Sequence, residues 1–484
     1  MEQLAKIYEV FSRFDEHNVV YCHWKSIFHL EATYRGDTDI DALFARNQRS
    51  LIETILAGCG FVRMDTVVLR AYPGIMDYVA LDEESGKWVH LHLHYYLNMG
   101  DRWVKSFHLN LEDFILKNRI WNESFQTFTV NPHDELSLLI ARMSLKSRVP
   151  FSYQASKNEL AFLVDEIVKV EKPESSFELT PVWQETVDMF YSGAPHDLDI
   201  VNTKGRSLRR EFSTFRRLSY LHFILLSSVR ATYRYNVEFR RRFLLRYNYG
   251  RRSIPHGGYI VAFVGIDGSG KTTGIRRLEK FFKLQVNVEN TFLGNGLSGA
   301  SFFRRVLFKS LSKVRAWKKH KKYRSNQATD PSSPPLYYLL WLLITLIEKR
   351  RNFKRTLQSA ANGNLVLVDR WPQNIIENTL DGRRITKRAN MSVLERYLYR
   401  LESDIISLSI RYRPDLVIKM LVTPSVAMAR KPNEFSEKVA NDNLKLLENM
   451  DYISSNTVMI NADLSIEEVD EQCKKLIWNT IKGE

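Results

Sequence analysis

The chain has 484 residues, 44% of them hydrophobic, which is enough for two or three domains with sizeable cores. Its three cysteines (Cys22, Cys59 and Cys473) lie far apart and form no CxxC pair, which argues against a disulfide framework and fits a reducing compartment. Residues 1–6 are expected to begin an amphipathic helix and not a signal peptide, and the longest apolar run, residues 336–347, is too short to cross a bilayer. We therefore expect a cytoplasmic protein, with peripheral attachment to a membrane as an open alternative.

The net charge of +15 is concentrated in two segments. Residues 204–252 contain 14 lysines and arginines against two acidic residues, a net charge of +12. Residues 301–329 contain 10 lysines and arginines and no acidic residue, a net charge of +10. The rest of the chain is therefore acidic. An interaction with an anionic membrane or polyanion is predicted to be local to these two segments.

Residues 1–203 are predicted to form one α+β domain, with a helix near its start and a strand at residues 18–22. The stretch 36–44 places Asp39 and Asp41 two positions apart, so on a strand both carboxylates face the same side. Two carboxylates held in this way suit Mg²⁺.

A further strand is predicted at residues 88–94, with His90, His92 and His94 on one face. The rise of a strand separates the outer two histidines by about 13 Å, so all three cannot bind one ion. We expect these histidines to form a polar strand face that lines a cleft, with metal binding as the alternative.

The Asp-x-Asp strand, preceded by Lys25-Ser26, resembles the polymerase-β type of the nucleotidyltransferase superfamily over about the first 100 residues. The resemblance implies metal-dependent nucleotidyl transfer at Asp39 and Asp41. The family carries a Gly-Ser pair where this chain has Lys25-Ser26. It also carries a third carboxylate on a later strand, where this chain offers histidines and Asp77 is the substitute. The alternative is a folded but non-catalytic module.

Residues 204–253 are predicted to form a basic helical connector, because Leu208, Phe212, Phe215, Leu218, Leu221, Leu225 and Val229 recur at spacings of three or four. Two interpretations stay open. The helix packs between the domains, or it lies on an anionic membrane surface. The composition of residues 253–258 is typical of a linker, and a second domain is predicted at residues 254–484.

The second domain begins with a strand, a glycine-rich loop and a helix. The loop, Gly265–Thr273, fits the phosphate-binding pattern G-x-x-x-x-G-K-[ST] at every fixed position. Successive backbone N–H groups of such a loop surround phosphate at a helix N-terminus, while the lysine reaches the β- and γ-phosphates. The residues predicted to bind the nucleotide are Gly265, Gly268, Ser269, Gly270, Lys271, Thr272 and Thr273.

Strand-like and helical segments alternate after this loop, which predicts a parallel sheet flanked by helices. Asp369 and Arg370 follow the buried strand predicted at residues 365–368. Ligands bind at the carboxyl ends of such strands, so both side chains are expected beside the loop. Further strands are predicted at residues 416–422 and 457–460.

Three segments of this half resemble the thymidylate kinase family of P-loop kinases: residues 264–273, 368–371 and 413–418. The resemblance implies ATP and Mg²⁺ as cofactors, with Thr272 and Asp369 at the metal. It also implies that Asp267 contacts the acceptor and that Arg370 holds the phosphates between donor and acceptor. Residues 427–431 occupy the place of a mobile lid, from which Arg430 or Lys431 would close over the donor.

The departures from this family fall in the acceptor pocket. The second strand is not followed by Glu-Pro-Gly, and residues 371–374 read Trp-Pro-Gln-Asn. The acceptor is therefore open, although the fusion of the two domains also resembles proteins associated with surface-polysaccharide synthesis. The function predicted is ATP-dependent phosphoryl transfer to a nucleotide or another small phosphorylated acceptor. The alternatives are nucleotidyl transfer at Asp39 and Asp41, or a non-catalytic ATP switch that docks on an anionic surface. A homo-oligomer is compatible with each.

Overall fold

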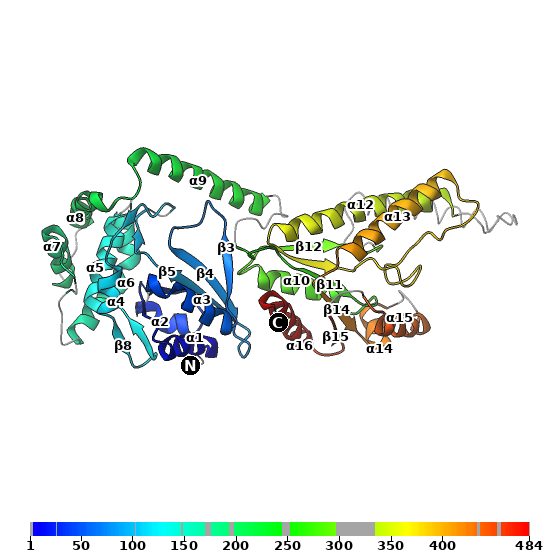
Figure 1. The fold of residues 1–484 in the computed structure, drawn as a ribbon, viewed down its shortest axis with the longest axis horizontal. Coiled ribbons are helices and arrows are strands. Elements are labelled where there is room, and N and C mark those ends of the chain that lie inside the picture. Colours follow the sequence, from blue (N-terminus) through cyan, green and yellow to red (C-terminus); the bar gives the residue numbers. More distant parts are fainter. Residues whose placement is uncertain are drawn as a thin grey trace. The chain divides into compact units, whose positions relative to one another are not determined.

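A computed structural model describes residues 3–25, 27–101, 103–146, 149–169, 175, 177–192, 198–243, 252–296, 334–432, 436–452 and 456–483. The chain divides into two compact units, Met1–Arg252 and Ser253–Glu484 (Figure 1). The basic segment 301–329, Ser26 and the last part of the predicted connector, residues 244–251, lie outside the described residues. None of the described helices has the length and apolar character needed to cross a membrane.

A mixed sheet organises the first unit. Eight described strands form it in the order β10-β3-β4-β5-β2-β1-β9-β8, and β2 runs parallel to β5 at its centre. A separate pair, β6 (Asn98–Met99) and β7 (Phe107–His108), is antiparallel. The strands of the large sheet are β1 (Tyr21–His23), β2 (Ile40–Phe44), β3 (Val62–Thr66), β4 (Ile75–Leu81), β5 (Trp88–His94), β8 (Ile120–Asn122), β9 (Thr127–Thr129) and β10 (Arg252–Ser253).

Alternation of side chains separates the two faces of this sheet. Ile40 and Ala42 of β2 and Leu91 of β5 pack with α1 and α3 in one core. The intervening residues, including Asp41 and His92, therefore face the other side. A second core lies among the helices α4 to α8. The helices of the unit are α1 (Ala5–Glu16), α2 (Leu30–Tyr34), α3 (Arg49–Gly58), α4 (Glu112–Lys117), α5 (Pro132–Ser144), α6 (Val149–Lys169), α7 (Pro181–Tyr191), α8 (Leu198–Glu211) and α9 (Tyr220–Phe243).

The predicted connector helix is interrupted in the structure. The helix α8 continues as a 3-10 turn, Phe212–Phe215, and α9 starts only at Tyr220. Between them Arg216 is extended and forms an isolated β-bridge with Phe107. This tertiary pairing overrides the continuous helical spacing of the sequence. The helix α8 also packs into the core of the first unit through Val201 and Leu208.

The second unit contains a parallel sheet. Its five described strands have the order β12-β13-β11-β14-β15, and every neighbouring pair is parallel. All residues of β11 and β13 are buried, as continuous apolar runs predict for central parallel strands. The strands are β11 (Ile260–Val264), β12 (Val288–Phe292), β13 (Leu365–Asp369), β14 (Leu416–Leu421) and β15 (Thr457–Asn461).

Helices cover this sheet (Figure 1). The helices α10 and α16 contact each other and the sheet, while Phe353 of α12 and Leu447 of α15 share a core with the strands. The helix α13 packs against α12. The described helices are α10 (Lys271–Phe282), α12 (Leu336–Ala361), α13 (Val393–Arg411), α14 (Pro424–Arg430), α15 (Glu437–Asn449) and α16 (Ile466–Lys482). The described part of the chain is thus α/β, with a large mixed sheet, a parallel sheet and the short antiparallel pair β6-β7.

Candidate functional site

The glycine-rich loop connects β11 to α10, the strand-to-helix context that its sequence pattern requires. Gly270 is the N-cap of α10 and has a φ of 87°, a left-handed conformation that favours glycine. Gly268 has a φ of 88°, and a Cβ atom there would lie 2.6 Å from the carbonyl oxygen of Ala427 in α14. The loop therefore requires glycine at both positions, once for conformation alone and once for conformation and space.

Lys271 is buried at the first position of α10 and points back into the loop. Its Nζ donates to the carbonyl oxygens of Gly265 at 2.8 Å and Ile266 at 2.7 Å, and to Ser269 Oγ at 3.1 Å. Burial and the nearby Arg370 guanidinium lower the pKa of Lys271 to about 7. An anion in the loop would favour the ammonium form and offer it stronger acceptors than neutral carbonyl groups.

Thr272, in the first turn of α10, meets Asp369, the last residue of β13. Thr272 Oγ1 donates to Asp369 Oδ2 at 2.7 Å. The other carboxylate oxygen, Oδ1, is buried and has no hydrogen-bond partner within the described part of the chain. A hydroxyl beside a buried carboxylate with unused acceptor capacity is a suitable oxygen-ligand set for hydrated Mg²⁺. These two residues therefore fit the metal that the sequence predicts.

Arg370 occupies a strained backbone position, with a φ of 74°, immediately after β13. Its guanidinium forms ion pairs with Asp267 of the loop and, at 3.0 Å, with Asp381. The carboxylate of Asp381, together with Asp267, raises the pKa of Arg370, so this side chain is a permanent cation. The two carboxylates hold the guanidinium at the edge of the loop.

Asp381 is a residue of this site that the sequence does not predict. It is buried, and its carboxylate also accepts from the backbone N–H of Asn295 at 3.1 Å. Burial raises its pKa, but Arg370 and the buried Lys349 of α12 outweigh this effect and lower the pKa overall. The signal in the sequence is only an Asp-Gly pair in a loop, which ordinarily predicts a turn and no more.

Arg430 lies at the end of α14 and reaches the glycine-rich loop. Its Nη1 is 3.5 Å from the carbonyl oxygen of Gly268, and its Nη2 donates to the carbonyl oxygen of Ala462 at 3.0 Å. The structure thus brings Lys271, Thr272, Asp369 and Arg370 together with Arg430 around one loop. Thr273 follows them in the first turn of α10.

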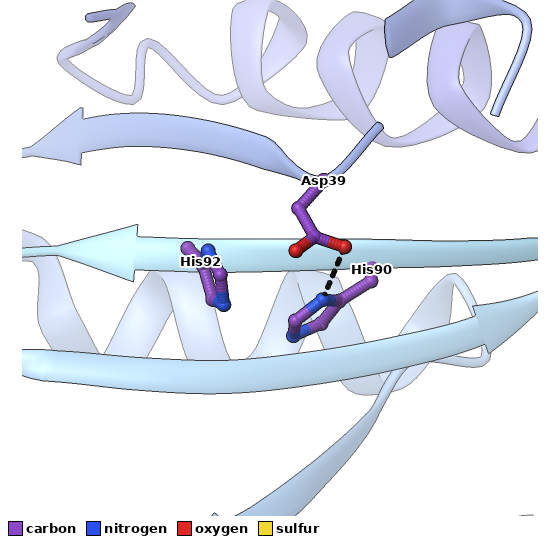
Figure 2. A group of neighbouring side chains, drawn as sticks. All are labelled: Asp39, His90 and His92. Atoms are coloured by element: carbon purple, nitrogen blue, oxygen red, sulfur yellow. Dashed lines mark hydrogen bonds and ion pairs between the residues drawn. The ribbon is translucent and has the colours of Figure 1, made fainter. Parts of the chain in front are cut away.

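Asp39 and Asp41 belong to the first unit, where they face β5. Asp39 Oδ1 lies 2.7 Å from Nδ1 of His90, and Asp41 Oδ1 lies 2.7 Å from Nε2 of His94. His92 lies between them, with its Nδ1 3.5 Å from Asp41 Oδ1. Figure 2 shows Asp39 above the two imidazoles of His90 and His92. The two carboxylates thus each contact a histidine of β5.

A third carboxylate completes this group. Asp77 on β4 is the direct cross-strand partner of His92, which is in turn the partner of Asp41. Asp77 Oδ1 lies 2.8 Å from Nε2 of His90 and 3.2 Å from Nε2 of His92. It also accepts from Nε of Arg252 at 3.1 Å. The strand pairing therefore places Asp77 beside the predicted carboxylate pair.

The electrostatics of this Asp-His cluster differ among its members. Burial raises the pKa of Asp41, but Lys25, His92 and His94 together hold it well below its usual range. Burial alone would lower the pKa of His92; its hydrogen bonds to Asp41 and Asp77 raise it to about 9. Burial and Lys25 lower the pKa of His94 to about 3. One imidazole is therefore cationic and another neutral at pH 7.

The helix α9 presents an apolar surface next to its basic residues. Leu221 is 78% exposed and Leu225 is 65% exposed. On its opposite side Arg230 is buried and donates to the carbonyl oxygens of Ala71 and Trp103. The other exposed apolar residues of α9 are Tyr220, Ile224, Val229, Tyr235, Phe239 and Phe243. This arrangement is compatible with both interpretations of the connector.

Comparison with known proteins gives distant similarities. No protein-family model matches the chain. It is 26% identical to the uncharacterized ATP-binding protein YghR of Escherichia coli K12 over 231 residues, which are 46% of this chain and 89% of that protein. It is 26% identical to the uncharacterized ATP-binding protein YghS of the same strain over 200 residues, 37% of this chain and 78% of that protein. The thymidylate kinase of Prochlorococcus marinus MIT 9301 is 22% identical over 235 residues, 47% of this chain and 98% of that enzyme.

Proposed function

We propose that the second unit binds ATP with Mg²⁺ and transfers the γ-phosphate to a small phosphorylated acceptor. The observation that carries this proposal is the convergence of Lys271, Thr272, Asp369 and Arg370 at the carboxyl ends of two parallel strands. The similarity to two proteins named as ATP-binding and to a thymidylate kinase supports the nucleotide part of the proposal.

Each residue has a role that follows from its position. The loop backbone and Lys271 bind the phosphates, because the lysine already lies within hydrogen-bonding distance of the loop carbonyls. Thr272 and Asp369 hold Mg²⁺. When bound, Mg²⁺ supplies charge neutralisation on the phosphate oxygens. Arg430 stabilises the donor side from α14.

Arg370 is the residue placed to interact with the phosphoryl group in transfer. Its ion pairs with Asp267 and Asp381 fix the guanidinium before substrate arrives, so little reorganisation is needed. Phosphoryl transfer depends mainly on such positioning and on positive charge near the γ-phosphate. An acceptor phosphate would compete with Asp267 for the exposed side of this guanidinium. Asp381, which is buried, would keep it in place.

Calorimetric titration with ATP and Mg²⁺ tests the binding half of this proposal. The wild-type protein should bind ATP, and Lys271→Ala should weaken binding strongly. Lys280→Ala is the matched control, because Lys280 is an exposed lysine on the same helix. Failure of the wild type to bind ATP at millimolar concentration would overturn the proposal. Equal affinity of the two lysine variants would overturn the role of Lys271.

A second candidate function, nucleotidyl transfer in the first unit, is favoured by the position of Asp77. With Asp39 and Asp41 it supplies the three carboxylates that the resemblance to nucleotidyltransferases requires. Release of pyrophosphate, and not ADP, would identify this reaction. Asp39→Asn and Asp41→Asn should each abolish pyrophosphate release and leave ADP release unchanged. Retention of pyrophosphate release in both variants would exclude catalysis at these carboxylates.

A further inference from the structure

The Asp-His cluster of the first unit combines ligand types that differ from those of a magnesium site. Across the described residues, one carboxylate oxygen of Asp39 and one ring nitrogen each from His90 and His92 lie within 4.8 Å of one another (Figure 2). Four-coordinate ligands about 2.1 Å from an ion are about 3.4 Å apart. Small side-chain rotations would therefore bring these three atoms to one metal.

The third histidine of the strand belongs to a different environment. His94 is buried, contacts Asp41 and packs edge-on against Trp24 with ring centroids 5.1 Å apart. Its Nε2 also lies 3.4 Å from Nζ of Lys25. His94 thus lies apart from the group formed by Asp39, His90 and His92, although Nδ1 of His92 also lies 3.5 Å from Oδ1 of Asp41. This group, and not the whole strand face, forms the potential ligand set.

Asp77, on β4, contacts both His90 and His92. One oxygen, Oδ1, lies 2.8 Å from Nε2 of His90 and 3.2 Å from Nε2 of His92, while Thr66 donates to the other oxygen. A carboxylate that accepts the N–H of a metal-binding histidine fixes its ring and tautomer. With both Nε2 atoms engaged by Asp77, the Nδ1 atoms are the ones available to a metal. Nδ1 of His90 already lies 2.7 Å from the carboxylate of Asp39.

The charge of the cluster also favours a cation. Three carboxylates and two basic side chains meet here, so the cluster has a formal charge of −1 once His92 gives up its proton to bind a metal through a ring nitrogen. In the metal-free arrangement, Nη2 of Arg252 lies 3.3 Å from Nδ1 of His90. The positive guanidinium of Arg252 therefore lies close to the position that a metal ion would occupy. It would move aside when the metal binds. The charged residues are Asp39, Asp41, Asp77, Lys25 and Arg252.

We propose that Asp39, His90 and His92 bind a divalent transition metal of the Zn²⁺ class, with Asp77 orienting the two histidines. Two imidazoles and one carboxylate suit Zn²⁺ and its neighbours, whereas Mg²⁺ prefers an octahedron of oxygen atoms. Three protein ligands leave a position open for water or for a substrate oxygen. All residues of this site belong to the first unit, and none of them takes part in the nucleotide site proposed for the second unit.

Cobalt titration of the 484-residue protein tests this inference. After removal of metals by a chelator, Co²⁺ is added without nucleotide and with excess Mg²⁺, which occupies oxygen-ligand sites. Co²⁺ bound by imidazole and carboxylate ligands gives a visible d–d absorption band that can be titrated, and Zn²⁺ should displace it. Asp39→Asn and His92→Gln should each weaken binding by more than the about 10- to 100-fold that loss of an orienting carboxylate causes.

The matched control is His108→Gln, because His108 pairs with Glu112 at 2.8 Å but lies outside the cluster. Its Co²⁺ affinity should equal that of the wild type. Circular dichroism reports whether each variant is folded, and Asp39→Asn, at a half-exposed side chain, keeps the test valid if His92→Gln unfolds. A wild type without a saturable band would overturn the inference. A band that excess Mg²⁺ removes, or one that is unchanged in folded Asp39→Asn, would do the same.

Discussion

Two glycine-to-alanine substitutions in adjoining parts of the second unit should have opposite effects. Gly268 has a φ of 88°, and its Cβ would lie 2.6 Å from a backbone oxygen of Ala427. Gly274, within α10, has no heavy atom within 4 Å of its Cβ position. Gly268→Ala therefore creates strain and a collision with α14, whereas Gly274→Ala adds a methyl group to an open helix surface.

The magnitudes follow from this geometry. A non-glycine residue in a strained backbone region costs about 1–3 kcal/mol. The neighbour is a backbone carbonyl, so the loop or α14 must shift, and a displacement of about 1 Å in a catalytic arrangement can reduce a rate about 100-fold. Alanine in place of glycine in a helix stabilises by about 0.5–1 kcal/mol. We expect Gly268→Ala to lose at least a factor of ten in ATP affinity (about 1.4 kcal/mol), and Gly274→Ala to bind normally.

Thermal denaturation and ATP calorimetry on the two variants measure both effects. Gly268→Ala should melt below the wild type and bind ATP weakly, while Gly274→Ala should melt at or above the wild type. Normal ATP affinity in folded Gly268→Ala would refute the geometry of the loop. Equal damage from the two substitutions would refute the distinction between a constrained and a free glycine.

Three further predictions concern the pH dependence of stability, the roles of Asp369 and Arg370, and the helix α9. Burial, with Glu159 adding to it, raises the pKa of Glu135 to about 8. The folded state therefore binds this proton more tightly than the unfolded chain, and stability falls as pH rises from about 4.5 towards 8. Glu135→Gln should thus raise the melting temperature relative to wild type at about pH 8.5 and change it little at about pH 4.5. Equal shifts of the melting temperature at the two pH values would contradict the raised pKa of Glu135. Asp369→Ala should weaken the Mg²⁺ dependence of turnover with ATP still bound, and Arg370→Ala should reduce ADP release more than ATP affinity; a purely affinity effect of Arg370→Ala would contradict its role. If α9 lies on a membrane, replacing Arg240, Arg241 and Arg242 with glutamate should abolish flotation with anionic liposomes. The assay is run at low salt, because physiological salt screens exposed charges beyond about 8 Å. Absence of wild-type flotation would favour interdomain packing.

The part of the site predicted from sequence depends on short-range patterns. The phosphate-binding pattern places Lys271 and Thr272 after a strand, and the apolar run at residues 365–368 places Asp369 at a strand end. Because parallel strands end at one edge, sequence alone predicts that these residues are near each other. The 2.7 Å hydrogen bond from Thr272 Oγ1 to Asp369 Oδ2 agrees with that expectation.

The remaining features of the fold and the site depend on contacts between segments that are distant in the sequence. Asp381 contacts Arg370 from a loop without periodicity, so no local pattern reveals it. The contact of Asp77 with His92 depends on the register of β4 against β5, which the sequence does not specify. The break before α9 arises from a bridge between Arg216 and the distant Phe107. These features require knowledge of which segments meet.

ADP release from ATP and Mg²⁺, measured against a panel of nucleoside monophosphates and sugar phosphates, tests the central claim most directly. We expect acceptor-dependent ADP release by the wild type and by Lys280→Ala. Lys271→Ala should be about a thousandfold slower, because one electrostatic contact to the transferred group is commonly worth about 3–4 kcal/mol. Equal ADP release by Lys271→Ala and the wild type would contradict phosphoryl transfer at this loop.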